Sequence, residues 1–121
     1  MRHYEDREQI ALVTWLRAMQ TRHPLVGLAY HTPNGGHRDP RVAAKFKALG
    51  LRRGVWDIFV PCPSPGLWIE MKSPKGRLTV EQAAWRDALE PAGYRFVVAY
   101  DWIAAARAIG MHCGVPDAEL P

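Results

Sequence analysis

Cysteine is scarce in this sequence, since Cys62 and Cys113 are the only two among 121 residues. Two cysteines are too few for a disulfide framework, and they lack the paired CxxC spacing of a structural zinc site. No run of about 18 consecutive apolar residues occurs, so we expect no membrane-spanning helix. The opening segment MRHYEDREQI has charges of both signs and no apolar stretch, unlike a signal peptide. We therefore expect two free thiols in a cytoplasmic protein.

The length and composition are those of one compact domain. Of the 121 residues, 48% are hydrophobic and 23% are charged, so the chain can bury one core but not two. We expect this domain to cover residues 1–110. Residues 111–121 contain two prolines and little periodicity, and we expect this tail to be loosely ordered or docked on a partner.

Basic residues outnumber acidic ones. Sixteen Lys and Arg against twelve Asp and Glu give a net charge of +4, and this excess favours a polyanionic partner. The candidates for nucleic-acid contact are Asn34, Arg38, Arg41, Lys45, Arg52, Arg53, Lys75 and Arg77. A solvated basic face would have the same composition. Charge alone therefore leaves both interpretations open.

Apolar spacing and turn formers predict an alternation of helices and strands. Helices are expected at residues 5–19, 41–49, 79–90 and 101–110. Strands are expected at residues 25–31, 55–60, 67–72 and 94–100. This order predicts an α/β fold with one mixed β-sheet, a central antiparallel hairpin and flanking helices. The last strand should run parallel to the strand at 67–72 through a right-handed crossover.

The loop at residues 61–66 sets the register of the central hairpin. With this loop, Ile58 faces Ile69 and Asp57 faces Glu70. Opposed residues have β-carbons roughly 4.5–5.5 Å apart, and two like charges there are destabilising unless something compensates them. A divalent cation such as Mg²⁺ would do so, since it binds one or two protein carboxylates together with water and phosphate oxygens. Lys72, two residues after Glu70, projects from the same face.

These residue types fit phosphodiester hydrolysis. A metal lowers the pKa of water and stabilises charge on phosphate, while a lysine can orient the nucleophile or stabilise the pentacovalent state. Glu-x-Lys on a strand is also a common solvated ion pair. However, Asp57 lies in the apolar run 55–60, where an unpaired charge is expensive. Lys72 could be its structural partner, so this alternative stays open beside the preferred metal site.

Several segments carry a resemblance to a known family. They are the acidic first helix, Pro33-Asn34-Gly35-Gly36 with Arg38, Gly50, Gly54-Val55-Trp56-Asp57, Ile69-Glu70-Met71-Lys72 and Thr79-Val80-Glu81-Gln82. Together, over nearly the whole chain, they resemble the virus-type replication-repair nuclease (VRR-NUC) domain of the PD-(D/E)xK nuclease superfamily. Members commonly read Gly-Val-Pro-Asp where this chain has Trp56 before Asp57. That departure leaves the carboxylate intact.

The resemblance implies a restriction-endonuclease-like core of two layers and a set of site residues. In it, Asp57, Glu70 and the main-chain carbonyl of Met71 bind Mg²⁺ or Mn²⁺, and Lys72 is the catalytic lysine. Gln82 matches a helix glutamine near the active site. The spacing from Thr79 to Gln82 is also that of a helix capping box, so two roles for Gln82 stay open.

The family pattern also includes a glutamate on the first helix. Glu8 is our first choice because it shares the apolar stripe of Leu12 and Leu16. Glu5 is the second choice, and a helix-start carboxylate is also favoured by the helix dipole. The loop with Asn34 could approach a phosphate closely, although Asn-Gly-Gly is also ordinary turn chemistry.

Histidines and tryptophans are weaker candidates. His31 and His37 flank the same loop and could contact phosphate, although loop histidines are usually only solvated. Trp56, Trp68 and Trp85 could stack on bases. Core packing is the preferred role for Trp85, while the two hairpin tryptophans stay open.

The resemblance implies a metal-dependent, structure-specific endonuclease that acts on DNA in a bacterial or phage-infected cell. Short stand-alone members of the family act as homodimers on branched DNA, especially Holliday junctions. Paired active sites suit the symmetric cleavage of a four-way junction. A flap or nicking endonuclease is the nearest alternative. A non-catalytic nucleic-acid-binding module and a structural protein are the competing classes.

Overall fold

The computed structural model describes residues 2–33 and 39–121. Their α-helices are α1 (Arg2–Met19), α2 (Pro40–Ala48), α3 (Val80–Leu89) and α4 (Trp102–His112), and their strands are β1 (Tyr30–His31), β2 (Ile58–Val60), β3 (Leu67–Met71) and β4 (Arg95–Ala99). Short 3-10 helices are η1 (Val26–Leu28), η2 (Glu90–Ala92) and η3 (Asp117–Glu119). None of the helices in these ranges is long and apolar enough to cross a membrane.

The four strands form one mixed sheet in the order β1-β2-β3-β4. β2 pairs antiparallel with both β1 and β3, whereas β4 runs parallel to β3. The hairpin register is the predicted one, with Ile58 opposite Ile69 and Val60 opposite Leu67. The predicted fold class, a mixed sheet with a central hairpin and flanking helices, is confirmed.

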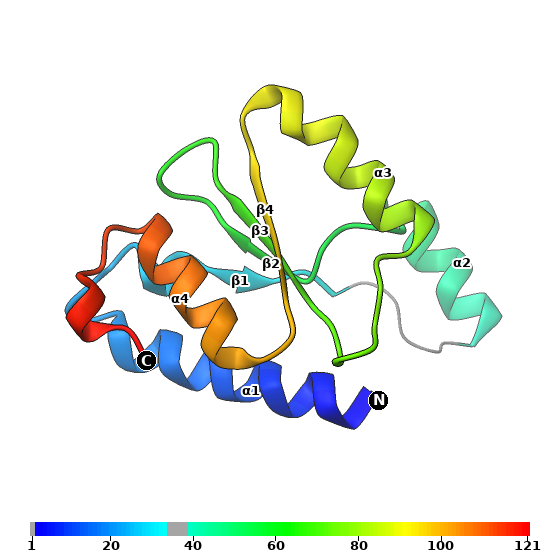
Figure 1. Ribbon diagram of the computed structural model, residues 1–121. Helices are drawn as coiled ribbons and strands as arrows, with labels where there is room; N and C mark the ends of the chain where they lie inside the picture. The colour runs from blue at the N-terminus through cyan, green and yellow to red at the C-terminus, as the bar shows by residue number, and fades with distance from the viewer. Residues whose placement is uncertain (1, 34–38) are drawn as a thin grey trace.

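One face of the sheet forms the hydrophobic core with α1 and α4, which lie side by side in Figure 1. Leu67, Ile69 and Met71 alternate along β3, so all three point to this face, and each is at most 1% exposed. They pack in the same cluster as Leu12 of α1 and Ile109 of α4. The three- and four-residue spacing of apolar residues on α1 keeps that helix on the sheet.

The opposite face of the sheet carries Trp68 and Glu70 and is covered by α3. Trp56 donates from its indole Nε1 to the main-chain carbonyl of Gln82 at 2.9 Å. Trp68 meets Trp85 edge to face, with ring centroids 5.5 Å apart. These contacts hold the N-terminal half of α3 over the end of the hairpin, which is where the candidate carboxylates lie.

Residues 25–31 do not form the predicted strand along their whole length. The structure has the 3-10 helix η1 there, followed by the two-residue strand β1. Main-chain N–H groups of Val26, Gly27 and Leu28 donate to carbonyls three residues earlier at 3.0–3.2 Å. These local turns satisfy the backbone after Pro24, and apolar content alone does not distinguish them from a strand.

The C-terminal tail packs on the domain, contrary to the expectation of a loose or partner-bound segment. Leu120 lies against Gly110, where an added Cβ would meet its Cδ2 at 2.2 Å. Arg107 pairs with Asp117 at 3.0 Å and donates to the Pro121 carbonyl at 2.9 Å. Val115 is 6% exposed and belongs to the core cluster, and Cys113 and Leu120 pack against that cluster. These few apolar residues do not form a regular pattern that would predict the docking of the tail.

Candidate functional site

Asp57 and Glu70 lie together at the open end of the β2–β3 hairpin. Asp57 immediately precedes β2, one step beyond the pair Ile58 and Ile69. Its main-chain N–H donates to Glu70 Oε1 at 3.1 Å, and its own Oδ2 accepts from the Met71 N–H at 2.9 Å. Each carboxylate therefore binds the backbone of the opposing segment. This geometry agrees with the predicted opposition of the two residues on one face.

Glu70 is the most enclosed charged residue of the site. It is 3% exposed, although two of its neighbours are polar side chains. Gln82 Nε2 donates to its Oε2 at 2.8 Å, and Lys72 Nζ lies 3.4 Å from the same oxygen. Burial first, and then the charge of Asp57, raise the pKa of Glu70 to about 8. Burial likewise raises the pKa of Asp57, against the hydrogen bond from Met71.

Lys72 directly follows β3 and turns its side chain to the carboxylate pair. Its side chain is 12% exposed, and its main-chain N–H donates to the Ala99 carbonyl at 2.9 Å. The structural alternative predicted an ion pair between Lys72 and Asp57. In the structure, Lys72 pairs with Glu70 instead. Among the residues that the structure describes, no Lys, Arg or His lies within ion-pair distance of Asp57. The lysine thus compensates only part of the negative charge.

The two glutamates of α1 have the opposite of their expected roles: Glu5, and not Glu8, lies beside the carboxylate pair. Glu8 Oε1 accepts from the Trp102 N–H at 2.9 Å, so Glu8 binds the N-terminus of α4 instead of lying over the carboxylate pair. Glu5 Oε2 accepts from the Ser73 N–H at 3.3 Å, and its charge contributes to the raised pKa of Asp57. Glu5 is therefore the α1 carboxylate beside the site.

Gln82 fulfils both of the roles that its spacing allows. Its Oε1 accepts from the Thr79 N–H at 2.9 Å, and its N–H donates to Thr79 Oγ1 at 3.1 Å, which completes the capping box of α3. Its Nε2 remains free for Glu70 Oε2. One amide thus starts the helix and binds the buried carboxylate, and the two interpretations do not exclude each other.

The end of β1 supports Asp57 through its backbone. His31 Nδ1 donates to the Asp57 carbonyl at 3.0 Å, and the Thr32 N–H donates to the same oxygen at 2.7 Å. Burial is the main influence on the pKa of Asp57 and raises it, while the neighbouring His31 acts in the opposite direction. From the sequence, His31 was expected to be a solvated loop residue or a phosphate contact, and Thr32 was assigned only to the turn. Asn34, His37 and Arg38 lie outside the described residues.

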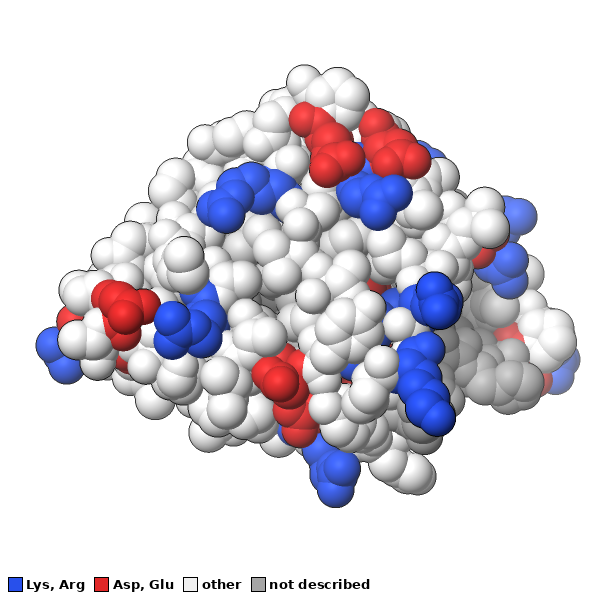
Figure 2. All heavy atoms as spheres, in the orientation of Figure 1, with Lys and Arg blue, Asp and Glu red and all other residues white. Residues whose placement is uncertain are grey.

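The candidate DNA-contacting residues that the structure describes are all exposed. These are Arg41 and Lys45 on α2, Arg52 and Arg53 before β2, and Lys75 and Arg77 between β3 and α3. Figure 2 shows several Lys and Arg side chains on the part of the molecule where α2 and the segment after β3 lie in Figure 1. This part of the surface adjoins the end of β3, where Lys72 is located.

The tryptophans are packing residues. Trp56 is 1% exposed and meets Phe96 edge to face, and Trp68 is 8% exposed and stacks near Phe59. Trp85 lies between Trp68 and the guanidinium of Arg52, which is 5.6 Å from its ring. Neither hairpin tryptophan offers a face to a base. Core packing, which was the preferred role for Trp85, is therefore also the role of Trp56 and Trp68.

The donor atoms at the site suit a hard divalent cation. No cluster of three or more His, Cys, Asp or Glu arranged as metal ligands occurs within residues 2–33 and 39–121. Mg²⁺ does not require one, because one or two carboxylates with water and phosphate oxygens complete its shell. Carboxylate and carbonyl oxygens also suit Mn²⁺. The raised pKa values of Asp57 and Glu70 indicate uncompensated negative charge that such an ion would stabilise.

Comparison with known proteins agrees with this geometry. A family model, the VRR-NUC domain, matches residues 4–102. A solved structure described as a VRR_NUC domain protein has a TM-score of 0.74 and 26% sequence identity, over 93% of this chain and 90% of that chain. No curated protein matches the chain. The matched segment includes most of α1, the whole sheet and the carboxylate pair. The chain therefore belongs to the VRR-NUC domain family, which is of nuclease type.

Proposed function

We propose that this chain is a divalent-metal-dependent, structure-specific endodeoxyribonuclease. In this proposal Asp57, Glu70 and the main-chain carbonyl of Met71 bind Mg²⁺ or Mn²⁺, and Lys72 is the catalytic lysine. The observation that carries it is the buried carboxylate pair, in which Asp57 and Glu70 bind each other's strands and Glu70 lies 3.4 Å from the Lys72 ammonium. Membership of a nuclease family supports the same chemistry with DNA as substrate.

The residues around the pair have separable tasks. When bound, the cation supplies a Lewis acid that stabilises negative charge on phosphate and lowers the pKa of water. Lys72 holds a positive charge where a phosphodiester would develop negative charge during hydrolysis. Gln82 fixes the orientation of Glu70 through a 2.8 Å hydrogen bond to Oε2. Because the amide is itself held by the capping box, this orientation is set before substrate arrives.

Glu5 replaces Glu8 in the proposed site. Its carboxylate lies at the end of β3, bonded to the Ser73 N–H at 3.3 Å. There it can orient water or bind the cation indirectly, as a third negative group beside Asp57. Glu8 instead holds the start of α4, so we assign it a structural role.

The DNA surface in this proposal surrounds the site. The exposed residues Arg41, Lys45, Arg53, Lys75 and Arg77 are suited to phosphate contact. Arg52, which lies over Trp85, holds its charge at the same surface. Asn34 and Arg38, which lie outside the described residues, are proposed for phosphate contact from the sequence alone.

Among DNA structures, we propose a four-way junction cleaved by a homodimer. The basis is the single carboxylate pair of this domain, because two symmetric cuts then need two copies of it. The nuclease unit includes residues 111–121, since Asp117 and Pro121 bind Arg107 of α4 and Glu119 binds Arg22, just after α1. Flap or nicking activity on one strand is the variant that a monomer would perform.

A cleavage assay with a panel of DNA structures tests this proposal. The purified protein is incubated with end-labelled four-way junction, flap and linear duplex, in Mg²⁺, in Mn²⁺ and in EDTA. We expect paired symmetric incisions in the junction with either metal and none in EDTA. A gel-shift experiment in EDTA serves as the control for binding. Binding to all three DNAs without incision in any metal would instead identify a non-catalytic module.

A further inference from the structure

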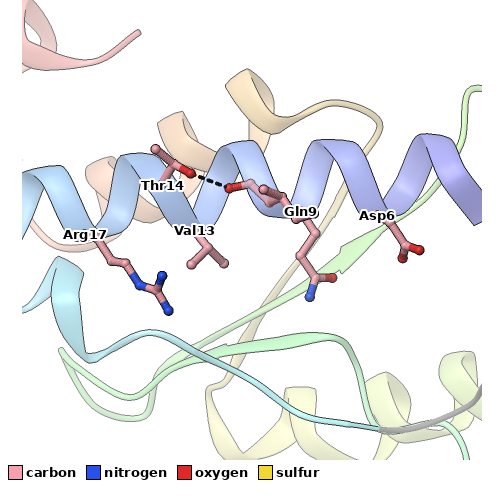
Figure 3. A pocket seen from close by; sticks show the side chains of 6 residues that line it. Asp6, Gln9, Val13, Thr14 and Arg17 are labelled. Atoms are coloured by element: carbon pink, nitrogen blue, oxygen red, sulfur yellow. Dashed lines mark hydrogen bonds between the residues drawn. The ribbon is translucent and has the colours of Figure 1, made fainter.

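The outward face of α1 is not used by the core or by the proposed active site. Asp6, Gln9, Ile10, Val13, Thr14 and Arg17 line a hollow of about 410 Å³ on it. In Figure 3, Asp6, Gln9, Val13 and Arg17 point to the same side of the helix. Ile10, near the middle of the face, is 67% exposed. Ile10 is therefore open to contact with another surface.

The spacing of these six residues is that of a helix-pairing seam. Successive positions differ by three residues or by one, so each residue has neighbours three and four positions away, which is how one helix presents a continuous stripe to another. The stripe that packs on the sheet is a different one, formed around Leu12 and Leu16. Helix α1 therefore has two stripes, one turned to the core and one turned outward.

The outward stripe is complementary to the same stripe of a second copy when the two helices run antiparallel. Asp6 and Arg17 stand at its two ends with opposite charge, Gln9 and Thr14 are polar positions inside them, and Ile10 and Val13 are the apolar centre. In an antiparallel pair of identical helices, each position meets its counterpart counted from the other end. Asp6 would then face the partner's Arg17 at both ends of the seam, with the apolar residues packed between them.

We propose that a second copy of this chain docks on this face. The two α1 helices lie antiparallel, and the two-fold axis passes between Ile10 and Val13. Such an isologous contact places the same patch on both subunits and closes at two copies. Among the side chains that the structure describes, which are those of residues 3–33 and 39–121, none forms an ion pair with Asp6 or Arg17.

This inference rests on the homodimer in the proposed function and names its surface. Glu5 immediately precedes Asp6, so each proposed active site lies near one end of the seam. Thirteen helical positions separate Glu5 from the place where the partner's Glu5 would lie, which is about 20 Å along the helix axis. The pairing thus separates two active sites by a distance fixed by one helix.

Charge reversal tests the surface. Asp6→Arg gives both ends of the seam a positive charge, and Arg17→Asp gives both ends a negative charge, so each variant should repel itself. We expect the dimer dissociation constant of each to rise by about tenfold or more in sedimentation experiments at low salt. An equimolar mixture of the two variants should restore the dimer, because both end contacts are then attractive. The double variant should dimerise in the same way.

Arg7→Asp is the matched control, since it changes the charge of α1 by the same amount outside the seam and should leave dimerisation unchanged. Circular dichroism establishes that each variant is folded. Single variants that dimerise as tightly as wild type, or a mixture that stays monomeric, would overturn the proposed surface. A wild-type protein that is monomeric at all concentrations would remove both the surface and the homodimer. Cleavage of DNA by the same samples reports separately on the nuclease proposal.

Discussion

At the scale of single residues, the site is built around the carboxylate of Glu70, whose surroundings disfavour its negative charge. Glu70 is buried beside Asp57, and its hydrogen-bond partners are an amide, an ammonium and a main-chain N–H. Burial and the neighbouring charge raise its pKa to about 8. Without a cation, a proton is the other charge that can satisfy the pair. The free energy of unfolding of the metal-free protein should therefore depend on the protonation of Glu70.

The first prediction concerns pH. The folded protein keeps a proton on Glu70 up to about pH 8, whereas the unfolded chain releases it near the ordinary pKa of 4.5. The folded state then binds more protons, so the free energy of unfolding falls as pH rises between these values. Urea denaturation in EDTA should show this fall for wild type and a flatter profile for Glu70→Gln. A difference between the two proteins that is constant from pH 5 to 8 would contradict the pKa assignment.

Gln82 provides a second prediction because its two contacts can be separated. Gln82→Ala removes both the capping box and the hydrogen bond to Glu70, whereas Thr79→Ala removes only the capping interaction. Each should cost about 1 kcal/mol of unfolding free energy. Only Gln82→Ala should also lower the cleavage rate, by roughly tenfold, because Glu70 loses its orientation. Equal cleavage rates for the two variants would reduce Gln82 to a helix cap.

At the scale of elements, the contact between α3 and the turn before Asp57 sets the distance from Gln82 to Glu70. Gly54 has φ +87°, and a Cβ there would lie 2.5 Å from the Glu81 carbonyl of α3. Gly50 has φ +104° and nothing within 4 Å of its Cβ position. Both glycines adopt a backbone that other residues find strained, but only Gly54 also touches the helix.

The third prediction compares these two glycines. Gly50→Ala should cost about 1 kcal/mol from backbone strain alone, measured by urea denaturation. Gly54→Ala should cost more, roughly 2–4 kcal/mol, because α3 must move away from the turn. Its cleavage rate should fall even in the folded fraction, since Gln82 moves with the helix. If the two variants were equally stable and equally active, the close contact would have no role in the site.

The elements also show which parts of the fold can be read from the sequence. The length of the loop at 61–66 determines which residues of the hairpin strands pair. The register, and from it the opposition of Asp57 and Glu70, could therefore be predicted from the sequence. Helix periodicity favoured Glu8 over Glu5, but residues three apart share one face, so the pattern was a weak basis for the choice. The choice depends on α4, whose first N–H groups need an acceptor that Glu8 supplies. That requirement is set by tertiary packing and is absent from the local pattern.

At the scale of the whole molecule, the two faces of the sheet have different tasks. The face toward α1 and α4 holds the apolar core, and the face toward α3 holds the polar site. The tail belongs to the first of these, because Leu120 packs beside Gly110 and the residues around it pair with Arg107, Arg22 and His23. Residues 111–121 should therefore contribute to stability and leave the chemistry unchanged.

The fourth prediction follows from this division. Leu120→Ala should lower the free energy of unfolding by about 1–3 kcal/mol, as expected for a partly buried leucine. The folded variant should cleave DNA at the wild-type rate. Leu49→Ala, at a residue that is 72% exposed, is the control and should change stability by less than about 0.5 kcal/mol. A tail that docks only on a partner would make the two variants equally stable.

The central claim is that Asp57, Glu70 and Lys72 form a metal-dependent catalytic centre. Its most direct test is the single-turnover rate of junction cleavage in saturating Mn²⁺ for wild type and Asp57→Asn. We predict a loss of about a thousandfold or more, because removal of one catalytic charge typically costs several kcal/mol of transition-state stabilisation. The control Asp87→Asn, on the exposed side of α3, should retain the wild-type rate. Cleavage by folded Asp57→Asn at the wild-type rate would contradict the account.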